Sequence, residues 1–248
     1  MLSSLLRYAP VAADLDPAVG VLDVGCGQLG LGSVFGNARF AGQDTAFTGP
    51  VTSAMFAVRT APGRFPWADA AFDTVVCLDT LAQVEAPERD AFVAECARVT
   101  ARRLLIACTT DNGLPAAELE ARCSRVDAFT HARWPQVNGL LTALIEHGDE
   151  DPAFAATAAR EFASHRAGWA ELIKAARFGD GPRRGYELTR DEPREPLVDP
   201  ARFDASTAAA LECSRCGTRL RLEPAVGLRC VGCGCIPARD ATGTWDLT

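Results

Sequence analysis

Three glycines and two acidic residues near the start of the chain have the types and spacing of a nucleotide-binding turn. Gly25, Gly27 and Gly30 follow a short apolar run and satisfy the pattern G-x-G-x-x-G, in which glycines allow a tight turn and close approach to a ligand. The pattern alone fits NAD, but a carboxylate at Asp23 suits a cationic group better than a pyrophosphate. Asp44, at the end of the next predicted strand, is placed to accept hydrogen bonds from ribose hydroxyls. A ligand with both a ribose and a cationic amino-acid portion is S-adenosylmethionine.

Two C-x-x-C pairs near the end of the chain have the spacing of metal ligands. Cys213 and Cys216 form the first pair, Cys230 and Cys233 form the second, and each pair is followed by a glycine. This arrangement predicts a tetrahedral Zn²⁺ site with four thiolate ligands. Cys235 competes for the fourth position, so the sequence leaves open whether Cys233 or Cys235 completes the site.

The remaining five cysteines are scattered through the first half of the chain among apolar or motif residues. We expect these five to be buried thiols of a cytoplasmic protein rather than disulfide partners. They are Cys26, Cys77, Cys96, Cys108 and Cys123.

The overall composition is that of a folded globular protein. The 248 residues are 48% hydrophobic and 23% charged, with a net charge of −7. A net acidic chain lacks the electrostatic footprint of a phosphate-backbone binder, so nucleic acid is disfavoured as a partner. No apolar stretch approaches the ~20 residues needed to span a membrane, and the N-terminus has no clear secretory signal.

Short apolar runs alternate with helical patterns over the first part of the chain, which predicts an α/β architecture with a parallel sheet. The predicted strands are residues 20–25, 39–44, 72–79 and 103–109, with a helix over 87–99 before the last of them. Residues 114–178 have mostly helical patterns, 185–190 resemble a late strand, and the proline-rich stretch 192–200 predicts a linker.

Two motifs in the right order resemble class I S-adenosylmethionine-dependent methyltransferases. Residues 22–27 (LDVGCG) are similar to the first motif of that family, and residues 65–79 (FPWADAAFDTVVCLD) are similar to the stretch that leads into its fourth strand. The resemblance covers about residues 8–110, and the late strand at 185–190 fits the closing strand of the family. It implies a Rossmann-like methyltransferase fold with S-adenosylmethionine as cofactor.

The same resemblance implies roles for individual residues. Asp44 would hold the ribose, while Asp79 and Leu81 would lie where the methyl donor meets the substrate. Two features depart from the family pattern: residues 60–64 contain no acid for the adenine amino group, and 81–83 read Leu-Ala-Gln instead of Leu-Glu-His. The residues around the methionine portion would be Asp23, Gly25, Cys26 and Gly27.

An oxygen or nitrogen acceptor can also need a base, and the chain offers few. Asp79 and His131 are the catalytic candidates that we select; Asp111, His147 and His165 are weaker ones. A helical insertion at about 137–180 would interrupt the last two strands of the family and cover the substrate side as a lid.

The cysteine-rich segment resembles the zinc ribbon of methyltransferase activator subunits and of their small bacterial relatives. The match comprises CSRCGTRL, GLRCVGCG and IPARD, with one residue fewer than usual after Cys233. The resemblance implies an activator-like module fused to the catalytic domain and a possible protein partner bound through the ribbon.

These observations predict three parts: a methyltransferase domain over 1–191, a linker over 192–206 and a zinc ribbon over 207–248. The expected activity is methyl transfer from S-adenosylmethionine to a small molecule, glycan or other metabolite. Two alternatives remain at this point: a catalytically silent scaffold of the same fold whose ribbon binds a partner protein, and an NAD-dependent reductase.

Overall fold

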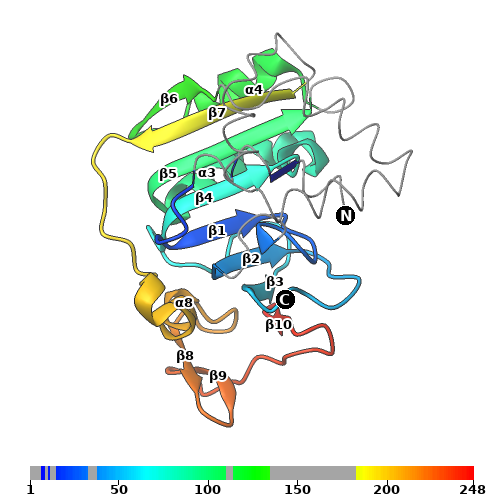
Figure 1. The fold of residues 1–248 in the computed structure, drawn as a ribbon, viewed down its shortest axis with the longest axis vertical. Helices are drawn as coiled ribbons and strands as arrows, with labels where there is room; N and C mark the ends of the chain where they lie inside the picture. The colour runs from blue at the N-terminus through cyan, green and yellow to red at the C-terminus, as the bar shows by residue number, and fades with distance from the viewer. Residues whose placement is uncertain (1–6, 9–10, 12–14, 33–37, 110–113, 135–182) are drawn as a thin grey trace.

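A computed structural model describes residues 7–8, 11, 15–32, 38–109, 114–134 and 183–248. Its centre is an eight-stranded sheet in the order β10-β3-β2-β1-β4-β5-β7-β6 (Figure 1). The predicted lid, about 137–180, lies outside the described residues, as do Asp111, His147 and His165.

The first five strands are parallel and run in the order of an open, doubly wound sheet. Chain order reverses between β1 and β4, which are neighbours although two strands separate them in sequence. Such a reversal leaves a crevice outside the carboxyl ends of the strands, where ligands of this architecture bind. The strands are β1 (Val21–Val24), β2 (Phe40–Asp44), β3 (Met55–Arg59), β4 (Phe72–Leu78) and β5 (Thr100–Thr109).

The far end of the sheet contains one reversed strand. β7 (Arg183–Arg190) is antiparallel both to β5 and to β6 (Phe129–Arg133). β6 is therefore parallel to β5. The chain leaves β6 and enters β7 at the carboxyl edge of the sheet, where β1, β2 and β4 also end.

Both faces of the sheet are covered, as the uninterrupted apolar runs predict. Along β5, Leu104 and Ile106 belong to one core cluster, whereas Leu105 and Ala107 belong to another. The first cluster includes Val93 of helix α3 (Arg89–Val99), which follows the short 3₁₀ helices η1 (Leu81–Gln83) and η2 (Ala86–Glu88). Helix α4 (Ala116–Cys123) adds Leu119 and Cys123 to the same cluster.

The cysteine-rich segment is built onto the sheet. Helix α8 (Phe203–Ala210), which follows 3₁₀ helix η3 (Pro200–Arg202), leads into the hairpin of β8 (Leu220–Glu223) and β9 (Gly227–Cys230). The chain then returns as β10 (Trp245–Asp246), which pairs in parallel with β3 (Figure 1). Arg59 of β3 pairs with Asp240 at 2.7 Å. Leu220, Leu228 and Trp245 belong to the same core cluster as Leu22 of β1.

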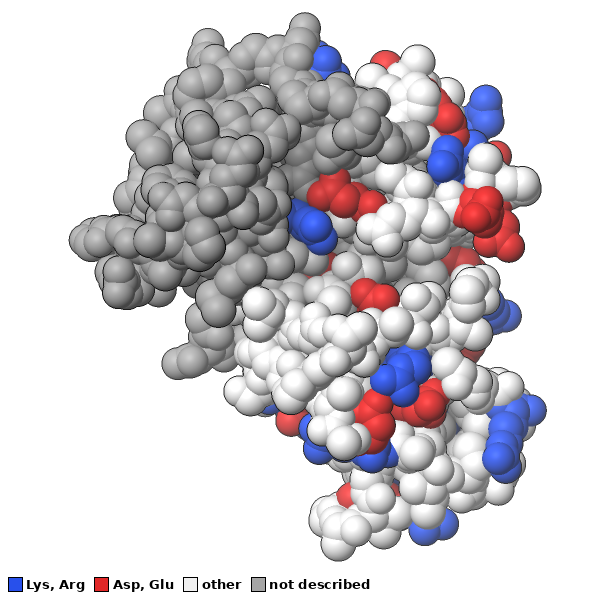
Figure 2. Space-filling view, turned by 90° about the vertical axis from the view of Figure 1, so that its right-hand side faces the viewer, with Lys and Arg blue, Asp and Glu red and all other residues white. Residues whose placement is uncertain are grey.

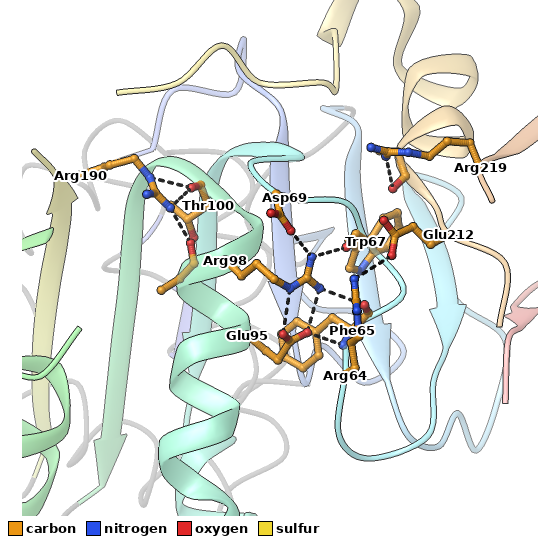
Figure 3. Close-up of polar contacts among 12 residues, drawn as sticks. Arg64, Phe65, Trp67, Asp69, Glu95, Arg98, Thr100, Arg190, Glu212 and Arg219 are labelled. Atoms are coloured by element: carbon orange, nitrogen blue, oxygen red, sulfur yellow. Dashed lines mark hydrogen bonds and ion pairs between the residues drawn. The ribbon is translucent and has the colours of Figure 1, made fainter. Parts of the chain in front are cut away.

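One arginine fixes the loop between β3 and β4 (Figure 3). Arg98 of α3 donates to the carbonyl oxygens of Phe65 (3.1 Å) and Trp67 (2.7 Å). It also pairs with Glu95 and Asp69, each at 2.8 Å. Glu95 in turn accepts from the amide of Phe65 at 2.7 Å. Side chains of α3 therefore both donate hydrogen bonds to the backbone of the predicted motif at 65–79 and accept one from it.

The surface drawn in Figure 2 carries basic and acidic side chains beside one another, and no continuous basic area is visible on that face. Among the helices that the structure describes, none has the length and apolar content required to cross a membrane.

Candidate cofactor site and metal centre

The glycine turn (residues 25–30) leaves β1 at the point where the chain order of the sheet reverses. Gly25, Gly27 and Gly30 have φ values of +75°, +56° and +44°, a region that side chains with a Cβ rarely occupy. A Cβ at Gly25 would lie 2.0 Å from Oγ1 of Thr80, so the strand end packs closely against the residues after β4. No described residue lies within 4 Å of a Cβ built at Gly27. Among the described residues, the turn therefore has open space beside Gly27.

Asp44 lies beside this turn, as its place at the end of β2 predicts. One carboxylate oxygen accepts from the amide of Gly27 at 2.9 Å, and the other accepts from the amide of Ala46 at 3.2 Å. The amide of Gly25 donates to the carbonyl oxygen of Gln43 at 2.8 Å, which joins the turn to β2. The half-buried carboxylate of Asp44 thus lies next to the open space at Gly27.

Asp23 lies beneath the turn and is completely buried. Its carboxylate accepts from the Tyr8 hydroxyl at 3.1 Å and from the Leu31 amide at 3.0 Å. Burial raises the pKa of Asp23 to about 7, because the charged form loses its hydration, although both hydrogen bonds oppose the shift. A Cβ at Gly30 would lie 2.5 Å from this carboxylate. Asp23 therefore stabilises the conformation of the glycine turn from its buried side.

The end of β4 contributes Asp79, which has a positive φ of +60°. Its amide donates to the carbonyl oxygen of Ala107 at 2.7 Å, and its carboxylate pairs with Arg7 at 3.3 Å. The side chain of Leu81 is fully buried in the core. Cys26 is also buried, which raises the pKa of its thiol. The structure thus brings Asp79 to the same edge as the turn, whereas Leu81 and Cys26 direct their side chains into the protein.

His131 is the predicted site residue that the structure does not bring to this edge. It is exposed on β6, the last strand of the sheet, with its ring 6.2 Å from that of Tyr186. Its register partner Leu188 pairs with Leu104 of β5, so His131 is level with the middle of the sheet rather than with its carboxyl ends. β7 and β5 separate it from β4.

Three residues at the site were not predicted from the sequence. Arg7 and Tyr8 come from a segment with no motif, and only the fold places them over the ends of β1 and β4. Thr80 directly follows Asp79, and its hydroxyl donates to the carbonyl oxygen of Val24 at 3.0 Å. A polar residue next to a motif is the one feature that could have indicated Thr80 in advance.

The cysteine-rich segment brings four of its thiols together in one group, in which Cys235 takes the place of the predicted ligand Cys216. The Sγ atoms of Cys213, Cys230, Cys233 and Cys235 lie within 4.8 Å of one another. The Sγ of Cys216 lies 3.5 Å from that of Cys230. Four thiolates around Zn²⁺ at about 2.3 Å would be separated by roughly 3.8 Å, which agrees with the Cys213–Cys233 distance of 3.7 Å. The soft donors and their spacing fit a zinc ion.

The two C-x-x-C pairs have the same backbone geometry. Gly217 follows the first pair with φ +71° and donates its amide to the carbonyl oxygen of Cys213 at 2.8 Å. Gly234 follows the second pair with φ +72° and donates to the carbonyl oxygen of Cys230 at 3.1 Å. Each pair therefore forms a turn that presents two sulfur atoms on one side. Cys235 lies outside this repeat, with its Sγ 3.3 Å from that of Cys213.

The five scattered cysteines are all buried and free, which confirms that part of the sequence analysis. None of them lies in the metal cluster, and burial raises the pKa of the Cys123 thiol to about 12. All five are enclosed in the protein, so these cysteines act as core residues.

A scan against protein-family models finds no match for this chain, and a search of curated proteins finds none either. Solved structures that are similar to it include the magnesium protoporphyrin IX methyltransferase of Synechocystis with bound S-adenosylmethionine: 17% identity, TM-score 0.41, 76% of this chain and 77% of that one. A TehB-like methyltransferase of Corynebacterium glutamicum is 14% identical with a TM-score of 0.49, over 75% of this chain and 87% of that one. A possible histamine N-methyltransferase of Thermotoga maritima is 13% identical with a TM-score of 0.45, over 75% and 91%.

At these identities and TM-scores the likeness concerns the fold alone. The features on which the fold assignment rests are in the chain itself: the order β3-β2-β1-β4-β5-β7-β6, the reversed strand β7 and the glycine turn at the β1–β4 crevice. With these features the chain has a Rossmann-like methyltransferase fold, extended by a small cysteine-rich element whose thiols could hold a metal ion.

Proposed function

We propose that this chain is an S-adenosylmethionine-dependent methyltransferase that acts on a small molecule, a glycan or another metabolite. The observation that carries the proposal is the position of Asp44. Its carboxylate lies against the glycine turn at the sheet crevice, with open space beside Gly27. An acid in this position accepts hydrogen bonds from ribose hydroxyls, and the turn gives a nucleoside close access to the backbone.

The residues of the crevice divide into those that would touch the cofactor and those that position them. Asp44 would hold the ribose, and the backbone at Gly25 and Gly27 would border the methionine portion. Asp23 is a positioning residue, because its carboxylate is enclosed by Tyr8 and Leu31 and contacts the turn from below. Cys26 and Leu81 would contribute backbone atoms, since their side chains are buried.

The cofactor, when bound, supplies a methyl group already activated on a sulfonium centre. The chain therefore has to bind and orient two molecules and exclude water from the point of transfer, and orientation alone lowers a barrier by several kcal/mol. Asp79 lies at the carboxyl end of β4, beside the crevice, and its bond to Arg7 fixes the direction of its carboxylate. We assign Asp79 to the acceptor side and give no catalytic role to His131, because of its place on the edge strand.

The cysteine-rich segment is proposed as a structural zinc ribbon over 207–248, after a methyltransferase domain at 1–191. The stretch expected to be a linker, 192–206, includes η3 and the first residues of α8. Four thiolates close the coordination sphere of zinc and leave no open position for a water ligand. The exposed apolar side chains of Val231 and Ile236 on this element support a role in binding a partner protein. Ten unpaired cysteines suit a reducing compartment such as the cytoplasm.

The proposal is tested by incubating the purified protein with methyl-labelled S-adenosylmethionine and fractionated extract of the host. We expect label in a fraction of small molecules or glycans, and strongly reduced transfer by the Asp44→Asn variant at cofactor concentrations below saturation. The Asp204→Asn variant, which changes an exposed acid of α8, is the matched control. Binding of the cofactor without transfer to any fraction would instead favour a silent scaffold.

A further inference from the structure

A second pocket lies at the amino edge of the sheet, away from the glycine turn. Its volume is about 490 Å³, which is within the range of small-molecule sites. The C-terminal half of α3 forms one wall, and the end of α4 with the turn into β6 forms the other. The register pair of Phe129 with Arg190, at the start of β6 and the end of β7, places the pocket at this edge. Five arginines line it: Arg98, Arg122, Arg125, Arg190 and Arg194.

Two of these arginines are neutralised by carboxylates of the same region. Arg98 pairs with Glu95 and Asp69 at 2.8 Å each, as Figure 3 shows. Arg122 pairs with Glu118 at 2.9 Å and also with Asp90. These two arginines are therefore fully compensated by four carboxylates, whereas the other three arginines have no such partner among the described residues.

Arg190 is buried without a carboxylate partner among the described residues. It is 7% exposed, and its Nε and Nη2 atoms donate to the carbonyl oxygens of Ala97 and Thr100 at 2.8–3.1 Å (Figure 3). The guanidinium carbon lies 4.4 Å from the centre of the Phe129 ring. Carbonyl groups at a helix end carry only a partial negative charge, so they offset part of one positive charge.

Two further cations lie around this buried one. Arg125 and Arg194 line the same pocket, and neither forms an ion pair with a described residue. Burial and the neighbouring Arg194 lower the pKa of Arg190, although the negative charge of Asp69 opposes this shift. The lining residues include one acid without a described ion pair, the exposed Asp127. The lining itself thus has five arginines against three aspartates. With Glu95 and Glu118 included, the two signs are equal in number, but three of the arginines have no carboxylate within ion-pair distance among the described residues.

We propose that this pocket binds the anionic group of a small organic molecule, a phosphate or a carboxylate, on Arg190, Arg194 and Arg125. Guanidinium groups bind both anions through paired N–H donors. The apolar part of the molecule packs against Phe129 and Val126, which line the wall opposite α3. The site is separate from the crevice at the glycine turn, so this inference does not depend on the proposed methyl transfer.

The full-length protein is titrated by calorimetry with phenyl phosphate, inorganic phosphate and benzoate, at constant ionic strength set with chloride. We expect saturable binding of at least one of these anions with one site per chain. Arg194→Gln and Arg125→Gln should each weaken that binding about tenfold, the effect of losing a charged hydrogen bond of roughly 1.5 kcal/mol. Arg190 is left unchanged because it also holds the end of α3.

The matched control is Arg202→Gln, which removes one exposed positive charge from η3. This variant should bind the anion as the wild type does, and so should Asp44→Asn. Preferential binding of benzoate would assign the site to carboxylates, and preferential binding of the phosphates would assign it to phosphate esters. Absence of saturable binding for all three probes would overturn the proposal. Equal affinity in the Arg125→Gln/Arg194→Gln double variant and the control would overturn it as well.

Discussion

The hydroxyl of Tyr8 donates to Oδ1 of Asp23 across 3.1 Å, and both residues are buried. Tyr8 belongs to the N-terminal segment, whereas Asp23 lies on β1 in the centre of the sheet. The bond therefore joins the start of the chain to the acid that supports the glycine turn. It also partly compensates a carboxylate that burial makes costly to ionise.

Replacing Tyr8 with Phe should destabilise the protein by about 1–3 kcal/mol, because a buried carboxylate oxygen loses its hydrogen-bond donor. The loss should be greater at pH 8, where Asp23 is charged, than at pH 5. Urea unfolding at both pH values measures the difference. Tyr186→Phe, which changes the other tyrosine of the chain, is the control, and an equal loss in both variants at both pH values would contradict this role of Tyr8.

The raised pKa of Asp23 predicts how stability depends on pH. Between the unfolded value of 3.8 and the folded value of about 7, the folded state holds a proton that the unfolded state has released. Stability should therefore fall as pH rises through this interval, with a slope of at most about 1.4 kcal/mol per pH unit, and level off above pH 7.

Asp23→Asn removes this dependence, because its amide is neutral at every pH and has the same shape. Unfolding free energies of the wild type and of Asp23→Asn, measured from pH 4.5 to 8, should diverge as pH rises, with the variant relatively more stable at the upper end. Parallel curves for the two proteins would show that Asp23 has an ordinary pKa.

Arg98 should be among the most sensitive charged residues of the fold. Arg98→Met would leave Glu95 without its cation and two carbonyl oxygens, those of Phe65 and Trp67, without their donor. A loss of about 2–4 kcal/mol is expected from such a partly buried network. Arg102→Met, which removes a half-exposed partner of Asp73, should cost less than Arg98→Met, because Arg102 bonds no backbone carbonyl of the loop. Chemical denaturation compares the two, and similar losses would contradict the central role of Arg98.

The central strands could be predicted from the sequence because strands buried on both faces consist mainly of apolar residues. Residues 72–79 form an almost continuous apolar run, and the observed strand is Phe72–Leu78. The positive φ values of Gly25 and Gly27 agree with the turn inferred from their spacing, and residues 185–190 proved to be part of the reversed strand β7.

Other elements depend on partners far away in the sequence. β3, β6, β8, β9 and β10 were absent from the predicted strands, and β6 lies within residues 114–178, for which we expected mostly helical structure. β6 forms by pairing with β7, and the two-residue β10 forms by pairing with β3. Phe203–Ala210 is helical, although the sequence analysis placed its beginning in a linker. Arg7 and Tyr8 were not found, since nothing local indicates that their side chains contact Asp79 and Asp23.

Zinc binding should stabilise the whole chain and not the ribbon alone. Apolar residues of this element, such as Leu228 and Trp245, share one core cluster with the sheet, and β10 pairs with β3. Since metal binding supplies folding free energy to small metal sites, a chelator should lower the unfolding temperature of the whole chain. Calorimetric scans with and without chelator test this. An unchanged main transition after complete removal of the metal would show that the two parts unfold independently.

The repeated geometry of the two C-x-x-C turns predicts which thiols bind the metal. Purified wild-type protein should contain one zinc per chain, and Cys216→Ser should lose it, because a turn of the repeat loses one of its sulfur atoms. Cys235→Ser should retain the zinc, since Cys235 lies outside the repeat. Metal analysis of the two variants distinguishes the ligand sets, and the reverse result would make Cys235 the fourth ligand in place of Cys216.

The central claim is that Asp44 and the glycine turn form the cofactor site, and calorimetric titration with S-adenosylhomocysteine tests it most directly. The wild type and Asp204→Asn should bind this ligand equally and more tightly than NAD. Asp44→Asn should bind it at least about tenfold more weakly, because charged hydrogen bonds to the ribose are lost. Tight binding of NAD with no binding of S-adenosylhomocysteine, or equal affinity in Asp44→Asn and Asp204→Asn, would contradict the account.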